Sequence, residues 1–428
     1  MMPHVRIVHL ALALALGLAA LAGCGPKKRP DGTLDAGSTG AVTAVPTAVE
    51  PKADAAHGKE LVAQFQCNRC HDGLAQIEPA PQNKHCVHCH RDIMDGKFKG
   101  KPDTIARWQP RVKDLQDAPS LEAAGKRMAA RWLEDYLLLP VDLRPGLVQA
   151  MPRLDISREQ ARDIAAYLVA GEVADTAPAP RGDAGKGRQI LESKACGTCH
   201  AFSGVAFLGG TAAGALAFTI DPKELPRAIR LAPDLRHVRA RMSPKRARAW
   251  LADPKAVKPD TLMPKVALTE SEITDVLAYL YNATLDVPPA KGVPARLAVL
   301  SRRVTFEEVD RKVFHRTCWH CHSEPDYAIG DGGPGNSGGL GFKPRGLNLS
   351  DYNGIAAGFL DGNNERQSIF AKDKDGVPRV VRALMARHAE EAGAPTGEVR
   401  GMPLGYPALS LEDVQLVETW IAQGRPRT

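Results

Sequence analysis

Residues 187–200 read GRQILESKACGTCH, a stretch of helix-forming residues that passes directly into a Cys-x-x-Cys-His motif. Residues 58–71, GKELVAQFQCNRCH, match this stretch position for position. The motif occurs twice more, at residues 86–90 and 318–322. The group that it binds therefore decides the fold, because that group would form part of every repeated unit.

The first two motifs, at residues 67–71 and 86–90, leave two interpretations open. Their cysteines follow the spacing C-x2-C-x15-C-x2-C, which is typical of zinc held by four thiolates. The alternative is a pair of c-type hemes, since in C-x-x-C-H both thiols form thioethers with the heme and the histidine ligates its iron. The two interpretations predict different proteins.

The full set of cysteines favours heme. Of the nine cysteines, eight fall in the four motifs and the ninth, Cys24, lies near the N-terminus. A zinc protein has no need of a histidine after every second cysteine, and the last two motifs have no neighbouring pair. A disulfide framework would not leave only two residues between every cysteine and its mate. We therefore expect four covalent c-type hemes, attached at Cys67, Cys70, Cys86, Cys89, Cys196, Cys199, Cys318 and Cys321, with His71, His90, His200 and His322 as axial ligands.

A second repeat lies downstream of the motifs. Residues 118–152 and 232–264 share the skeleton Ala-Pro-x-Leu, Arg-Met, Trp-Leu and Met-Pro, and another Met-Pro occurs at residues 402–403. Each Met-Pro precedes a predicted helix start, which has an N-cap serine or threonine and acidic or amide residues in the next turn. We expect these helices to begin at Ser157, Thr269 and Ser410.

This order of helix, C-x-x-C-H, loop, methionine and C-terminal helix resembles that of class I cytochrome c domains, and it covers residues 57–428 three times over. The resemblance implies an all-α fold of three tandem domains. In that family the methionine sulfur is the distal iron ligand. This implies that Met151, Met263 and Met402 are iron ligands, whereas Met128 and Met242 are expected to fill the core.

The third unit departs most from the other two. It carries a glycine-rich segment at residues 330–342 and reads LNLSDYNG where the others have Ala-Pro-x-Leu. It also ends in a Met-Pro and Trp-Ile pattern. In these features it resembles cytochrome domains of the planctomycete type.

The motif at residues 86–90 needs a separate explanation. The interval from His71 to Ala118 is about fifteen residues longer than that from His200 to Ala232, so we expect this motif to be a heme-bearing insertion. A rival alignment instead pairs His90 with Met151, but it leaves the helix before Cys67 unexplained. The sixth ligand of this second heme is left open, with His57 and Met94 as candidates, while His85 and His88 are possible ligands of the neighbouring heme.

The N-terminus, MMPHVRIVHLALALALGLAALAGC, has the basic start, short apolar run and small residues of a signal peptide. Its end, Leu-Ala-Gly-Cys, resembles a bacterial lipobox, which implies lipidation at Cys24. The following residues are rich in Pro, Gly, Ala and Thr and predict a flexible tether. The expected organisation is signal peptide 1–23, tether 24–56, and cytochrome c domains at 57–172, 183–286 and 298–428, called below the first, second and third segments.

The composition suits an exported electron carrier. Hydrophobic residues make up 44% and charged residues 25%, and the net charge of +7 is not gathered into a basic cluster with aromatics, so nucleic acid is not expected as a partner. No nucleophile–base pair, dinucleotide fingerprint or phosphate loop was found, so we expect no enzyme. The expected function is a tetraheme cytochrome, anchored as a lipoprotein to the inner or outer membrane, that relays electrons between a donor and an acceptor protein on the periplasmic side. Two alternatives stay open: a peroxidase or small-molecule reductase with an open site at the second heme, and the cytochrome subunit of a membrane dehydrogenase.

Overall fold

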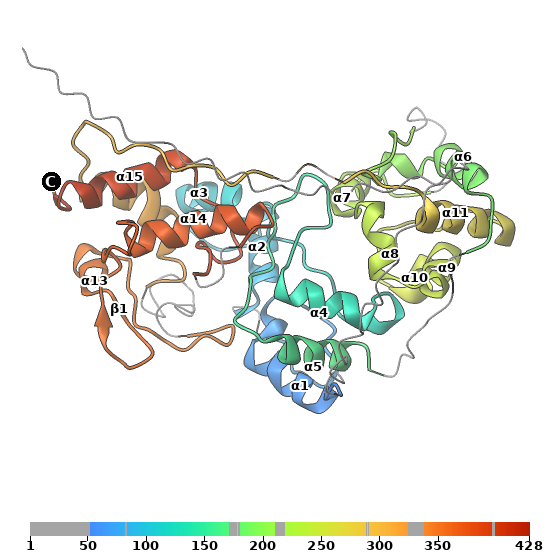
Figure 1. Ribbon diagram of the computed structural model, residues 1–428, viewed down its shortest axis with the longest axis horizontal. Coiled ribbons are helices and arrows are strands. Elements are labelled where there is room, and N and C mark those ends of the chain that lie inside the picture. The colour runs from blue at the N-terminus through green and yellow to red at the C-terminus, as the bar shows by residue number, and fades with distance from the viewer. Residues whose placement is uncertain are drawn as a thin grey trace, which may run out of the picture. The chain divides into compact units, whose positions relative to one another are not determined.

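The computed structural model describes residues 52–81, 84–170, 178, 180–209, 219–287, 289, 291–323, 338–395 and 399–428. These residues belong to one compact unit, Lys52–Thr428, and the unit is mostly helical, as expected (Figure 1). Within the described ranges no helix has the length and apolar character needed to cross a bilayer. The predicted signal peptide, the lipidation site and most of the tether lie outside the described residues.

The first segment is built around a pair of packed helices from its two ends, α1 and α5 (Figure 1). Asp54 caps α1 by accepting hydrogen bonds from two backbone amides, so this helix begins within the residues expected as tether. The helices cross closely because Gly58 has no side chain: a Cβ there would lie 1.9 Å from the Asp163 carbonyl oxygen. The helical elements of this segment are α1 (Ala55–Gln64), η1 (Cys67–Arg69), α2 (Cys86–Met94), α3 (Pro102–Val112), η3 (Ala124–Lys126), α4 (Ala130–Leu138) and α5 (Arg158–Leu168).

The second segment repeats this construction with α6 against α11. Gly187, which matches Gly58 in sequence, again lies at the crossing, and a Cβ there would lie 2.0 Å from the Asp275 carbonyl oxygen. Its elements are α6 (Ala184–Ser193), η4 (Cys196–Thr198), α7 (Leu225–Leu231), η5 (Leu235–His237), α8 (Val238–Arg241), α9 (Pro244–Ala252), α10 (Pro254–Val257) and α11 (Glu270–Asn282).

The predicted helix starts are confirmed. Ser157 and Thr269 both form complete capping boxes, in which the side chain accepts from the N3 amide and the N3 side chain accepts from the N-cap amide. Ser410 caps the last helix through the Asp413 amide. Met128 and Met242 are 7% and 4% exposed within hydrophobic clusters, so the expectation that they fill the core is confirmed.

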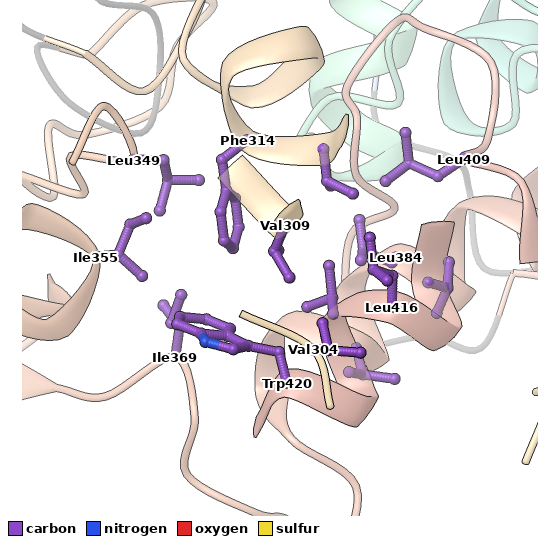
Figure 2. Close-up of a cluster of buried hydrophobic side chains, with 14 of the residues drawn as sticks. Val304, Val309, Phe314, Leu349, Ile355, Ile369, Leu384, Leu409, Leu416 and Trp420 are labelled. Atoms are coloured by element: carbon purple, nitrogen blue, oxygen red, sulfur yellow. The ribbon is translucent and has the colours of Figure 1, made fainter. Parts of the chain in front are cut away.

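The third segment has a larger apolar core and the strands of the described chain. Trp420 is fully buried and packs with Phe314, at 6.0 Å between ring centroids, and with Val309 (Figure 2). The strands form one two-stranded antiparallel sheet with Phe359 opposite Gln367. The elements of this segment are α12 (Phe306–Val309), η6 (Asp310–Cys318), α13 (Tyr352–Ala357), β1 (Phe359–Leu360), β2 (Arg366–Gln367), α14 (Arg379–Glu391) and α15 (Leu411–Ala422).

The helix expected before Cys318 is present but changes type along its length. After one α-helical turn it continues as a π-helix, η6. The hydrogen bond from the Trp319 amide to the Phe314 carbonyl, five residues back, has the spacing of that wider helix. Sequence periodicity alone does not distinguish the two types.

Candidate heme sites

The histidines of the first and second segments are held in the same way. The Nδ1 atom of His71 lies 2.9 Å from the Pro119 carbonyl oxygen, and that of His200 lies 2.8 Å from the Pro233 carbonyl oxygen. Both prolines belong to the repeated Ala-Pro-x-Leu sequence. The geometry therefore favours the alignment of His71 with His200 over the rival that uses His90.

These contacts fix the protonation of each ring. A carbonyl oxygen only accepts, so Nδ1 carries the proton and donates it, which leaves the Nε2 lone pair available to a metal. Burial lowers the pKa of both His71 and His200, so the neutral form is favoured. A neutral imidazole whose Nδ1–H is held by a carbonyl is the usual state of a metal-ligating histidine.

The motif at residues 86–90 differs from the others because it begins a helix. Cys86 is the first residue of α2, and His85 caps this helix by accepting from the His88 amide. His90 is buried, its Nδ1 atom lies 3.1 Å from the Leu115 carbonyl oxygen, and burial lowers its pKa to about 4. The insertion thus presents its histidine in the same tautomer as the other two, by a different local structure.

In the third segment the half-buried His322 lies near the Leu347 carbonyl, which occupies the place of the proline in the other segments. Burial lowers the pKa of His322 to about 4. Its Nδ1 atom makes no hydrogen bond of ordinary geometry within the described part of the chain. The backbone of this loop is nevertheless tied to the motif, because the Leu349 amide donates to the His322 carbonyl at 2.6 Å.

Two arginines test whether the first two segments fit a heme. Arg127 and Arg241 occupy the same position of the repeated Arg-Met sequence, and each donates to the sulfur of the next methionine at 3.9 Å. Arg127 is 6% exposed, and burial lowers the pKa of Arg241 to about 10. Among the described residues neither forms an ion pair with a carboxylate, and both Nε atoms lack a hydrogen-bond partner. Arg127 also donates to the Ser120 carbonyl, and Arg241 is half-buried. A cation removed from water is stabilised by a nearby anion, and the two carboxylates of a heme would supply one.

The three methionines that the resemblance implies as ligands have the following surroundings. Met151 packs against the same hydrophobic cluster as Cys67, and Met402 against the same cluster as Cys318. The Met263 sulfur lies 2.8 Å from the indole Nε1 of Trp250. Two methionines thus border the same hydrophobic cluster as the first cysteine of their own motif.

Three of the four candidates around the second heme have partners elsewhere. His57 pairs with Asp163 at 2.8 Å, in the contact between α1 and α5. His85 and His88 stack at 3.5 Å between ring centroids, and their Nε2 atoms lie 3.3 and 3.1 Å from the two carboxylate oxygens of Asp72. Met94 is the last residue of α2.

The geometry does not support four-thiolate zinc. Within the described ranges, the set of three or more ligand atoms close enough to share an ion is that of Asp72, His85 and His88. Cys70 and Cys86 are near enough to raise the pKa of the Cys70 thiol through a mutual hydrogen bond. The four thiols at residues 67–89 nevertheless do not come together as one such set.

Tyr406 is a residue that the sequence did not single out. Its ring meets that of His90 edge-on, with 6.3 Å between centroids. Burial raises its pKa, and so do neighbouring thiols from three motifs, which are those of Cys321, Cys86, Cys89 and Cys70. The motifs at residues 67–71, 86–90 and 318–322 therefore converge around one side chain. No local pattern indicates this, because Tyr406 lies far along the chain from the first two motifs.

Comparison with known proteins agrees with this geometry. A search of curated proteins finds no match to the chain. Residues 184–284 match the family model described as Cytochrome c, and this match spans the α6–α11 pair, the Cys196–His200 motif and Met263. The chain therefore contains a cytochrome c domain at residues 184–284, and this domain implies covalently bound heme c.

Proposed function

We propose that the protein is a tetraheme electron carrier in which three tandem cytochrome c domains pass electrons from a donor protein to an acceptor protein. The cytochrome c domain at residues 184–284 suggests heme-based electron transfer for this part. The extension to the whole chain rests on the remaining motifs, whose histidines are half-buried like His200 or, for His90, buried.

The observation that carries the proposal is the matched environment of His71 and His200. Each is half-buried, each holds its Nδ1 proton on the carbonyl of a repeated proline, and each lies in a segment with an arginine whose Nε atom has no hydrogen-bond partner among the described residues. A heme bound there supplies an iron that cycles between Fe(II) and Fe(III) at a potential set by its axial ligands and surroundings. The protein would hold the axial histidine, supply the methionine ligand, balance the charge of the heme carboxylates with an arginine and exclude water from the iron.

The number of covalent hemes tests this proposal. Intact-mass measurement of the denatured protein, after acid–acetone treatment, should show four heme increments because thioether bonds survive both steps. The double variant Cys86→Ser/Cys89→Ser should carry three hemes, and the absorption spectra of those three hemes should be unchanged. Two hemes with one equivalent of bound zinc would contradict the proposal and restore the zinc interpretation of residues 67–89.

A second candidate function is a redox enzyme that uses the heme at Cys86–Cys89. It is favoured by the contacts of His85 and His88, whose Nε2 atoms engage Asp72. An iron without a sixth protein ligand binds small molecules. A cytochrome subunit of a membrane dehydrogenase is the narrower alternative, and co-purification of a catalytic partner would identify it.

Carbon monoxide distinguishes carrier from enzyme. A carrier whose four irons all have two protein ligands should not bind carbon monoxide in the reduced state. Titration followed by the Soret band measures this directly. Binding at one heme in four, together with a high-spin ferric signal, would favour the enzyme.

We further propose that the carrier is exported and held to the inner or outer membrane by lipid at Cys24. The support is the signal-like N-terminus and the lipobox-like sequence that ends at this cysteine. Lipid attachment with a tether of about thirty residues would leave the hemes free to meet partners beside the membrane.

A further inference from the structure

The loops that carry two of the methionines touch each other. Arg400, two residues before Met402, donates to the carbonyls of Arg153 at 3.2 Å and Leu154 at 2.7 Å, just after Met151. The third-segment loop can approach because Gly405 has no side chain: a Cβ there would lie 3.0 Å from the Ala150 carbonyl oxygen. Residues 149–155 are called here the first methionine loop, and residues 400–406 the third methionine loop.

One arginine binds both loops. Arg387, on α14, is 1% exposed. Its guanidinium donates to the side-chain oxygen of Gln149 at 3.1 Å and to the Gln149 carbonyl at 2.6 Å. Its Nε atom donates to the Tyr406 carbonyl at 2.8 Å. The planar guanidinium carries N–H donors that point in several fixed directions, so one arginine can bind both loops at once. A lysine, with its single ammonium group, could not reproduce these contacts.

The contacts continue to both methionines. On one side the side-chain Nε2 of Gln149 donates to the Met151 carbonyl at 2.6 Å. On the other, Glu390 pairs with Arg387 at 3.4 Å and accepts from the Gly401 amide, beside Met402, at 2.9 Å. A continuous chain of buried hydrogen bonds therefore runs from the backbone of one methionine to that beside the other.

The charges in this chain hold it in one arrangement. Glu390 is 4% exposed and also lies 3.6 Å from the Arg153 guanidinium. Removing one partner of a buried ion pair strongly destabilises the folded protein, because the remaining charge stays buried without an opposite charge beside it. A shift of either loop would break contacts to Arg387, so the loops are expected to move together.

We propose that Arg387 is a positioning residue that couples the first and third methionine loops, so that the irons served by Met151 and Met402 are tuned together. This inference rests on the proposed function, since it requires that both methionines bind iron. The weak iron–sulfur bond is sensitive to the placement of its ligand, and hydrogen bonds behind the ligands of a metal tune that metal. The iron served by Met263 lies outside the coupling.

The test uses the full-length, heme-loaded protein and the methyl resonances of iron-bound methionines, which heme ring currents displace from all others. Each resonance is first assigned by its own Met→Leu variant. Arg387→Met should then shift or remove the resonances of both Met151 and Met402, leave that of Met263 in place, and shift two of the midpoint potentials. Arg382→Met is the matched control, since Arg382 lies on the same helix and pairs with Asp375, within the third segment. It should move neither the Met151 resonance nor its potential.

Gln149→Leu tests the coupling from the other side. It changes only the first segment, yet it should move the Met402 resonance as well, because coupling between two sites is reciprocal. This variant also decides the question alone if Arg387→Met fails to fold. The coupling would be overturned if Arg387→Met moved only the Met402 resonance and Gln149→Leu moved only the Met151 resonance. That outcome would leave the proposed electron-carrier function standing. Equal movement of all three resonances would overturn it too, whereas no iron-bound methionine in the unaltered protein would overturn the proposed function as well.

Discussion

At the scale of single residues, the two kinds of methionine in the second segment give a direct prediction. Met263 has its sulfur beside the Trp250 indole, whereas Met242 is 4% exposed in the core. Met263→Leu should remove roughly one third of the iron–sulfur charge-transfer band of the oxidised protein and lower one heme potential, because one of three sulfur-ligated irons loses its ligand. Leucine is close to methionine in volume, so the fold should persist. Met242→Leu is the control and should leave the band unchanged. If Met242→Leu weakened the band and Met263→Leu did not, Met242 would be the iron ligand and Met263 the core residue.

At the scale of elements, the crossing of α6 and α11 gives the second prediction. Gly187→Ala would place a Cβ 2.0 Å from the Asp275 carbonyl, so the helices must separate. Forced separation of packed elements typically costs about 1–3 kcal/mol, which thermal unfolding of the heme-loaded protein would detect. Gly185→Ala, on the same helix, meets only the Asp183 side chain at 3.3 Å and should be nearly neutral. Equal effects of the two substitutions would mean that the close crossing is not what requires glycine.

At the scale of the whole molecule, the anchor is open to a simple experiment. Cys24→Ser should move the protein from the membrane fraction to the soluble fraction, because lipid attachment requires the thiol. Its heme content should stay the same, since Cys24 belongs to none of the four motifs. Ser38→Ala in the tether is the control and should remain with the membrane. Membrane binding that survives loss of Cys24 would contradict the lipid anchor.

Sequence reasoning reached the parts of this fold that depend on neighbouring residues. The capping boxes at Ser157 and Thr269 were visible because their members are three residues apart. The helices before Cys67 and Cys196 could be expected because residues 58–71 match residues 187–200, but their close crossings at Gly58 and Gly187 are seen only in the structure. The repeated Arg-Met sequence was visible too, but its arginines gained meaning only when their burial without a carboxylate partner was known.

What the sequence could not predict are contacts between side chains that are distant along the chain. The pairing of His57 Nδ1 with Asp163, 106 residues away, has no sign in the sequence around either residue. Arg387 and Gln149 belong to no motif, and each is an ordinary residue of its own segment. Tyr406 likewise has no local pattern that would place it against His90. Such pairs are set by how separate segments pack, and one sequence without that packing carries no sign of them.

The contact between Arg387 and Gln149 joins residues 238 positions apart, and this separation imposes an order on biosynthesis. A chain made from its N-terminus folds its early portions before the late ones exist. The first methionine loop therefore lacks its contacts with the third methionine loop until the C-terminal portion has been made. During that interval the motif at residues 86–90 lacks the Tyr406 ring that later meets His90, which would leave its thiols open to attachment of the heme proposed for them. That interval ends when the last segment packs against the first. Any heme attachment that needs open access to the first segment would therefore have to come before the last segment folds.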